Sequence, residues 1–226
     1  MQKRPDAGFF QAVIFDMDGV IFDSEREVFY AWEEVARGKG ITDISVPLRQ
    51  CLGVTKKESE IILKKYYGDD FPYDTFAAEA SVIYRGRTSG GRLPLKAGTR
   101  ELLQALRDHH VPVALASSTR RETVERELTE AGLISYFQAI ICGDMVKKSK
   151  PEPDIYLTAC RALGAAPEES IAIEDSYNGI RSAAGGHLRP IMVPDLMEPT
   201  DEMRTLAEKI FPSLLEVRAY LFPEDS

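Results

Sequence analysis

The chain has 226 residues, of which 44% are hydrophobic and 28% charged, a composition typical of a globular protein with one sizeable core and a smaller second domain. Its formal net charge of −8 and the lack of a basic stripe argue against binding to nucleic acid, and no apolar run reaches the roughly 18 residues of a membrane span. We therefore expect neither nucleic acid nor a membrane as a partner. The 3 cysteines lack C-x-x-C spacing, and residues 1–8 lack the apolar core of a signal peptide, which together favour a cytoplasmic protein. A monomer is the simplest expectation.

The first predicted element is a buried strand that ends in two acids. Residues 12–15 are all apolar, and Asp16 and Asp18 follow directly, with Gly19 completing a turn. Two carboxylates this close repel each other, and burial next to the strand leaves them poorly hydrated. The arrangement therefore predicts a cation between them, either a hard metal ion or a lysine.

A helical insertion follows this strand. The capping boxes Ser24-x-x-Glu27 and Thr55-x-x-Glu58 each precede apolar residues at helical spacing, and no strand pattern interrupts them. The pair Gly90-Gly91 ends the helical pattern. Residues 24–92 are thus predicted to form an all-helical cap domain, whereas residues 1–23 and 93–226 form the core domain.

From residue 95 onward, strands alternate with helices. This alternation predicts an α/β fold with a parallel sheet and helices on both faces. The capping box Thr119-x-x-Glu122 predicts the start of one helix, and Lys150-Pro151-Glu152-Pro153 predicts the start of another. The predicted strands after the first are residues 111–116, 139–142, 171–173, 190–193 and 209–211.

Polar residues follow the carboxyl ends of three predicted strands. Asp16 and Asp18 follow the first, Ser117 the second, and Glu174 and Asp175 the fourth. In an open parallel sheet this edge binds ligands, so these residues are expected to converge there. Singly, Asp18-Gly19 is also compatible with a simple turn, and Ser117 to Thr119 with a helix cap. Together they predict an oxygen-rich Mg²⁺ site, to which Lys150 adds a charge that can hold phosphate.

Four motifs in register resemble the haloacid dehalogenase superfamily, and within it the β-phosphoglucomutase-like phosphatases and phosphosugar mutases. The motifs are Asp16-Met17-Asp18-Gly19-Val20, Ser117 after Ala114-Leu115-Ala116, Lys150-Pro151, and Glu174-Asp175 before Ser176-Tyr177-Asn178-Gly179-Ile180. The resemblance covers about residues 11–193 and implies a Rossmann-like core with an inserted helical cap.

The resemblance also implies roles for the motif residues. Asp16 would be the nucleophile that forms an aspartyl-phosphate, and Asp18 the general acid and base. Mg²⁺ would be held by Asp16, Asp175, Glu174 and the backbone carbonyl of Asp18, although Glu174 is equally compatible with a supporting role beside the metal ligands. The phosphoryl oxygens would be bound by Ser117, Lys150 and the backbone N–H groups of Met17, Asp18 and Ser118.

Three functions stay open on this basis. A small phosphate ester, a sugar or polyol phosphate by family analogy, would be hydrolysed by a phosphatase or isomerised by a mutase. A catalytically silent sugar-phosphate-binding protein is disfavoured because the acids and Lys150 are all present. β-Phosphoglucomutases carry a histidine at the position of Val28 and an arginine at that of Lys56, so the departures favour hydrolysis.

Substrate selection is assigned to the cap. The residues expected to contact the substrate there are Glu25 and Val28 in the first cap helix, and Gly53 and Lys56 in the following loop.

Overall fold

The computed structural model describes residues 9–52, 54 and 56–225 and divides the chain into two compact units. The first unit comprises residues 1–22 and 95–226, and the second comprises residues 23–94. Each unit has its own hydrophobic core, so each is described by itself.

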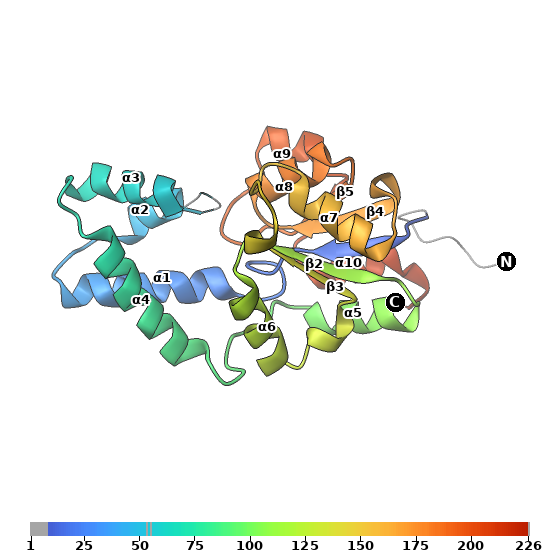
Figure 1. The fold of residues 1–226 in the computed structure, drawn as a ribbon, viewed down its shortest axis with the longest axis horizontal. Helices are drawn as coiled ribbons and strands as arrows, with labels where there is room; N and C mark the ends of the chain where they lie inside the picture. The colour runs from blue at the N-terminus through green and yellow to red at the C-terminus, as the bar shows by residue number, and fades with distance from the viewer. Residues whose placement is uncertain (1–8, 53, 55, 226) are drawn as a thin grey trace. The chain divides into compact units, whose positions relative to one another are not determined.

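Among the described residues of the first unit, six strands form one parallel sheet in the order β3-β2-β1-β4-β5-β6 (Figure 1). The parallel α/β fold predicted from the alternation of strands and helices is therefore confirmed. The strands are β1 (Ala12–Phe15), β2 (Val113–Ser117), β3 (Ala139–Cys142), β4 (Ser170–Glu174), β5 (Arg189–Met192) and β6 (Lys209–Ile210).

Helices follow most of these strands and cover both faces of the sheet. Figure 1 shows α7 (Asp154–Leu163) and α8 (Tyr177–Gly185) on one side and α5 (Thr99–Asp108) on the other. The remaining helices are α6 (Arg121–Glu130), α9 (Asp201–Leu206), α10 (Leu214–Leu221) and the short 3₁₀ helices η1 (Ile134–Tyr136), η2 (Gly143–Met145), η3 (Pro167–Glu169) and η4 (Pro223–Asp225).

Strand β1 occupies the middle of the sheet because it is apolar on both faces. It pairs with β2 on one side and with β4 on the other, and all its residues are buried. Ile14 packs on the side of α7 in a cluster that includes Tyr156. Successive side chains in a strand point to opposite faces, so Val13 and Phe15 are buried on the other side.

The predicted start of helix α7 at Lys150 is wrong by several residues. The helix begins at Asp154, with Pro153 as its N-cap residue. A residue that precedes a proline is disfavoured in helical conformation, so the two prolines keep residues 150 and 152 outside the helix. Lys150 therefore lies in a loop.

Within its described residues, the second unit contains only helices: α1 (Ser24–Gly38), α2 (Ser45–Gln50), α3 (Lys56–Tyr67) and α4 (Tyr73–Thr88). Helix α1 packs against α4, with the Trp32 ring stacked on Phe76 at a centroid distance of 5.1 Å. The sequence pattern did not predict α2. No helix in the described ranges has the length and apolar character needed to cross a bilayer.

Candidate active site

The carboxyl ends of β1, β2 and β4 bring the acidic motif residues together. β1 lies between β2 and β4, so Asp16 directly follows the central strand while Ser117 and Glu174 end its neighbours. Asp16, Ser117, Glu174 and Asp175 are all buried. The sheet order thus builds a polar cluster in which hydration is largely replaced by protein contacts.

Lys150 neutralises part of this cluster. Its ammonium donates to Asp16 Oδ1 at 2.7 Å, to Glu174 Oε1 at 2.6 Å and to the carbonyl of Ala116 at 3.0 Å. Burial disfavours the charged ammonium, but the two carboxylates outweigh burial and raise the pKa of Lys150 above its ordinary value. Lys150 is therefore a permanently charged bridge between two acids from different strands.

Asp16 is only partly stabilised as a carboxylate by this bridge. Burial raises the pKa of Asp16 to about 7, and although Lys150 counteracts this, the negative charges of Glu174 and Asp18 add to it. About half of the Asp16 side chains would therefore carry a proton at neutral pH. A second cation near Asp16 would keep it ionised.

Glu174 is fully buried and is held by donors on both carboxylate oxygens. Oε1 accepts from Lys150 and, at 2.7 Å, from the Tyr156 hydroxyl. Oε2 accepts from the backbone N–H of Asp175 at 3.1 Å, and from the backbone N–H at 3.2 Å and the hydroxyl at 3.0 Å of Ser176. These donors replace the water contacts that burial removes from the carboxylate.

The sequence reasoning missed Tyr156. Its ring is buried in the core beside the sheet, and its hydroxyl is the polar tip that reaches Glu174. Burial and the nearby carboxylates raise the pKa of Tyr156 well above its ordinary value, so the hydroxyl stays a donor. The only sequence signal for this contact was a tyrosine on the apolar face of the helix that follows Lys150. A tyrosine on such a face is equally compatible with a core residue.

Asp16, Glu174 and Asp175 form a set of donors that fits a hard divalent cation. One carboxylate oxygen from each lies within 4.8 Å of the other two. Mg²⁺ prefers oxygen ligands, and the three side chains that converge here are buried carboxylates. The backbone carbonyl of Asp18 stays a predicted fourth ligand.

Asp18 is contacted by Thr119, a residue that the sequence predicts to cap a helix. The hydroxyl of Thr119 donates to Asp18 Oδ2 at 2.8 Å. The predicted capping box at Thr119 is wrong, because α6 begins at Arg121 with Arg120 as its N-cap residue and without a side-chain cap. A hydroxyl just before a helix is a good local cap, but here it is used by a carboxylate from a distant part of the chain.

The other predicted phosphate ligands lie in the same loops. Met17 is fully buried between the two aspartates, and Ser117 is fully buried at the end of β2. Ser117 Oγ accepts the backbone N–H of Thr119 at 3.1 Å, whereas Ser118 is exposed. The backbone N–H groups of Met17, Asp18 and Ser118 stay predicted ligands.

The predicted substrate residues of the second unit differ in their surroundings. Val28 is 40% exposed on α1, and Glu25 is half-buried. Lys56 forms an ion pair with Asp74 at 2.8 Å, so its charge is partly balanced within the same unit. Gly53 lies outside the described residues.

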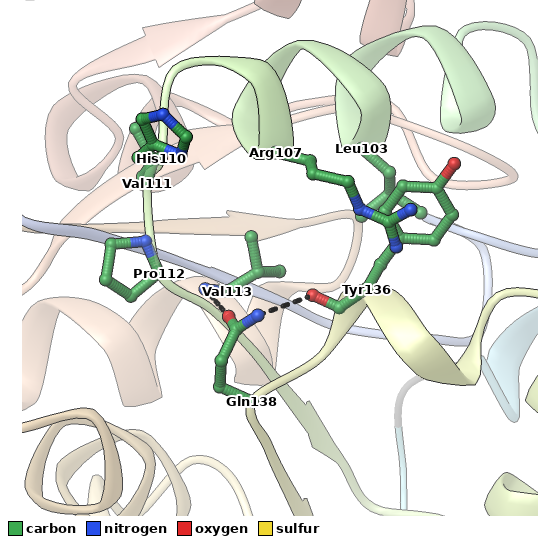
Figure 2. A pocket seen from close by; sticks show the side chains of 8 residues that line it. All are labelled: Leu103, Arg107, His110, Val111, Pro112, Val113, Tyr136 and Gln138. Atoms are coloured by element: carbon green, nitrogen blue, oxygen red, sulfur yellow. Dashed lines mark hydrogen bonds between the residues drawn. The ribbon is translucent and has the colours of Figure 1, made fainter.

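A separate pocket of about 350 Å³ is lined by eight residues that Figure 2 shows, and it lies near the start of β2. Val113, which begins β2, lines it, whereas Ser117 ends that strand at the acidic cluster. The Gln138 side chain accepts from Val113 N at 2.7 Å and donates to the carbonyl of Tyr136 at 3.3 Å. Arg107 covers the ring of Tyr136 with its guanidinium carbon 3.6 Å from the ring centroid. None of the acidic motif residues lines this pocket, so it is not part of the candidate active site.

Comparison with known proteins gives matches that extend over most of the chain. A family model described as haloacid dehalogenase-like hydrolase matches residues 10–187. This range includes all the acidic motif residues, Lys150 and the whole second unit.

Individual relatives include both hydrolases and a mutase. The phosphorylated carbohydrates phosphatase of Thermotoga maritima is 34% identical over 182 residues, which cover 80% of this chain and 83% of the relative. The beta-phosphoglucomutase of Bacillus subtilis is 30% identical over 207 residues, covering 83% of this chain and 88% of the relative. A crystal structure of a HAD family hydrolase from Deinococcus radiodurans R1 with bound phosphate and sodium is similar with a TM-score of 0.79 and 27% identity, covering 96% of this chain and 96% of that chain.

Proposed function

The chain belongs to the haloacid dehalogenase-like hydrolase family, and from this premise we propose that it is a Mg²⁺-dependent phosphatase of a small sugar or polyol phosphate. The observation that carries the proposal is the contact of Lys150 with Asp16 and Glu174 at the edge where Asp18 also lies. This arrangement holds an ionisable nucleophile, a fixed cation and a second acid together. The named phosphatase among the relatives supports the choice of a phosphorylated carbohydrate.

We assign the nucleophile to Asp16. Lys150 holds Oδ1 of this carboxylate, which orients the group so that its other oxygen can attack phosphorus. The new bond joins Asp16 to phosphorus, and the ester bond between phosphorus and the alcohol oxygen breaks. The result is an aspartyl-phosphate and a free alcohol.

We assign proton transfer to Asp18. In the first half-reaction it gives its proton to the departing alcohol oxygen, and in the second it takes one from the water that attacks the aspartyl-phosphate. The second step releases inorganic phosphate and restores Asp16 as a carboxylate. Asp18 thus returns to its starting protonation state after each turnover.

Positive charge and N–H groups would hold the transferring phosphoryl group. Ser117, Lys150 and the backbone N–H groups of Met17, Asp18 and Ser118 would bind its oxygens, where charge is spread in the transition state. Mg²⁺ held by Asp16, Glu174, Asp175 and the carbonyl of Asp18 would supply positive charge beside Asp16 and the phosphoryl oxygens.

Residues 24–92 would form the cap that selects the substrate. We propose hydrolysis rather than intramolecular transfer because a mutase must grip a second phosphate with a cation of the cap, and Lys56 is a point charge without the bidentate fork of the arginine that β-phosphoglucomutases carry there. Glu25, Val28, Gly53 and Lys56 are the proposed selecting residues. A cytoplasmic monomer fits a free metabolite as substrate.

The test is a phosphate-release assay with Mg²⁺ over a panel of sugar and polyol phosphates. It runs beside a test for conversion of glucose 1-phosphate to glucose 6-phosphate with a bisphosphate primer. We expect phosphate release by the wild type and none by Asp16→Asn. Fast conversion with little free phosphate would establish the mutase instead, and absence of both reactions would favour a silent binding protein.

A further inference from the structure

Thr119 is fixed at the edge of the acidic cluster by three contacts. Its hydroxyl donates to Asp18 Oδ2 at 2.8 Å, its N–H donates to Ser117 Oγ at 3.1 Å, and its carbonyl accepts from Gly143 N at 3.2 Å. The side chain therefore links the loop after β1 to the loop after β2, and its backbone is held by the residue that follows β3.

Gly143 makes this arrangement tight. A Cβ atom at this position would lie 2.2 Å from the carbonyl oxygen of Ser118, a separation that no real side chain tolerates. The backbone after β3 thus packs directly on the Ser118–Thr119 segment. This close packing limits how far Thr119 can move away from Asp18.

We propose that Thr119 is a positioning residue that orients Asp18 for proton transfer, an inference that rests on the proposed phosphatase function. A threonine hydroxyl has one donor and two acceptor positions. In the structure the Thr119 hydroxyl donates to Asp18 Oδ2. This contact restricts rotation of the Asp18 carboxyl group.

Loss of the hydrogen bond between Thr119 and Asp18 is expected to slow the cleavage of those esters whose leaving group needs a proton donor. An alkyl phosphate expels a strongly basic alkoxide, so its cleavage depends on Asp18, whereas p-nitrophenolate is stable without a proton. General acid catalysis contributes about 10²- to 10⁴-fold, and misplacement of a catalytic group by about 1 Å removes about 10²-fold. Thr119 acts on placement only, so its removal takes away part of the acid's contribution.

The experiment compares Thr119→Val, which keeps the shape but loses the hydroxyl, with Thr119→Ser, which keeps the hydroxyl. Thr205→Val is the matched control, because the Thr205 hydroxyl donates to the carbonyl of Asp201 on an exposed helix. For each protein, kcat/KM is measured with Mg²⁺ on the best sugar phosphate of the panel and on p-nitrophenyl phosphate. This constant reports the steps up to release of the alcohol.

We expect Thr119→Val to lower kcat/KM for the sugar phosphate by about 10- to 100-fold and for p-nitrophenyl phosphate by less than about threefold. Thr119→Ser should restore most of the loss, and Thr205→Val should match the wild type. Equal losses on both esters, or none, would overturn the positioning role. If the valine variant fails to fold, Thr119→Ala replaces it in the same comparison. A wild type that cleaves neither ester would overturn the proposed function itself, and the role of Thr119 with it.

Discussion

Replacement of the proposed nucleophile by asparagine is expected to stabilise the metal-free protein while it abolishes turnover. Asp16 lies in a buried cluster where burial raises its pKa from 3.8 to about 7. Between these values the folded protein binds a proton that the unfolded chain has already released. The unfolding free energy of the wild type therefore falls as the pH rises through this window. The amide of an asparagine does not ionise, so the unfolding free energy of Asp16→Asn does not fall with pH in this way.

The size of the stability difference follows from the pH range between the unfolded and folded pKa values of Asp16. Each pH unit corresponds to about 1.4 kcal/mol, so the full window amounts to about 4 kcal/mol. Between pH 5 and pH 8 the unfolding free energy of Asp16→Asn should rise relative to the wild type by about 3 kcal/mol. For a chain of this length, such a difference corresponds to about 6 to 12 °C in Tm.

The assay is urea denaturation of both proteins in EDTA across this pH range. Asp74→Asn is the matched control: Asp74 is an exposed carboxylate whose pKa is lowered by its hydrogen bond to Lys56, so it stays ionised throughout. Addition of Mg²⁺ should reduce the pH dependence of the wild type, because a cation beside Asp16 favours the carboxylate. Parallel pH profiles for wild type and Asp16→Asn would refute the claim that burial leaves this carboxyl short of positive charge.

Three further substitutions test the supports of the site and the second unit. Gly179→Ala would place a methyl group 1.8 to 2.1 Å from the carboxylate atoms of Glu174. We therefore expect urea denaturation to show a loss of about 1–3 kcal/mol in unfolding free energy. Unchanged stability would mean that Glu174 moves freely. Lys150→Met removes the cation between Asp16 and Glu174. We expect the unfolding free energy at pH 8 to fall by about 3–5 kcal/mol and phosphate release to stop. An active variant would contradict the role of Lys150. Arg87→Ala removes an exposed guanidinium that contacts both carboxylate oxygens of the partly buried Glu27, so calorimetry should show a fall in Tm smaller than that of Lys150→Met. A drop in Tm as large as that of Lys150→Met would indicate a structural role for this pair.

Much of the sheet and its acidic edge was predictable because both depend on short local patterns. An apolar run with acids at its end predicts a buried strand that delivers carboxylates to the sheet edge, and β1 with Asp16 follows this pattern. The resemblance of four motifs to one family is confirmed by the family model. Helix α2 was not predicted because six residues that include Pro47 are too short to show helical periodicity.

The hydrogen-bond partners inside the site could not be predicted in the same way. Thr119 has two uses for its hydroxyl, and the local rule favoured a helix cap over a carboxylate that lies 101 positions earlier in the chain. The sequence pattern predicts Tyr156 as a core residue, and its ring is indeed buried in the core. Only the tertiary structure shows that its hydroxyl contacts Glu174. Choices between a local and a distant partner require the tertiary structure.

The charges of the cluster couple the metal to the substrate. Asp16, Glu174 and Asp175 contribute three negative charges when ionised, Lys150 contributes one positive charge, and in the proposed mechanism Asp18 carries the proton that the first half-reaction uses. A phosphate monoester dianion that approaches this edge meets a net negative charge even though Lys150 is well placed to bind it. Lys150 is also engaged by two carboxylates, so it cannot turn fully toward the phosphoryl group while they lack another cation. A divalent ion held by Asp16, Glu174 and Asp175 would relieve both constraints, so metal binding and phosphate binding at this site should be mutually dependent.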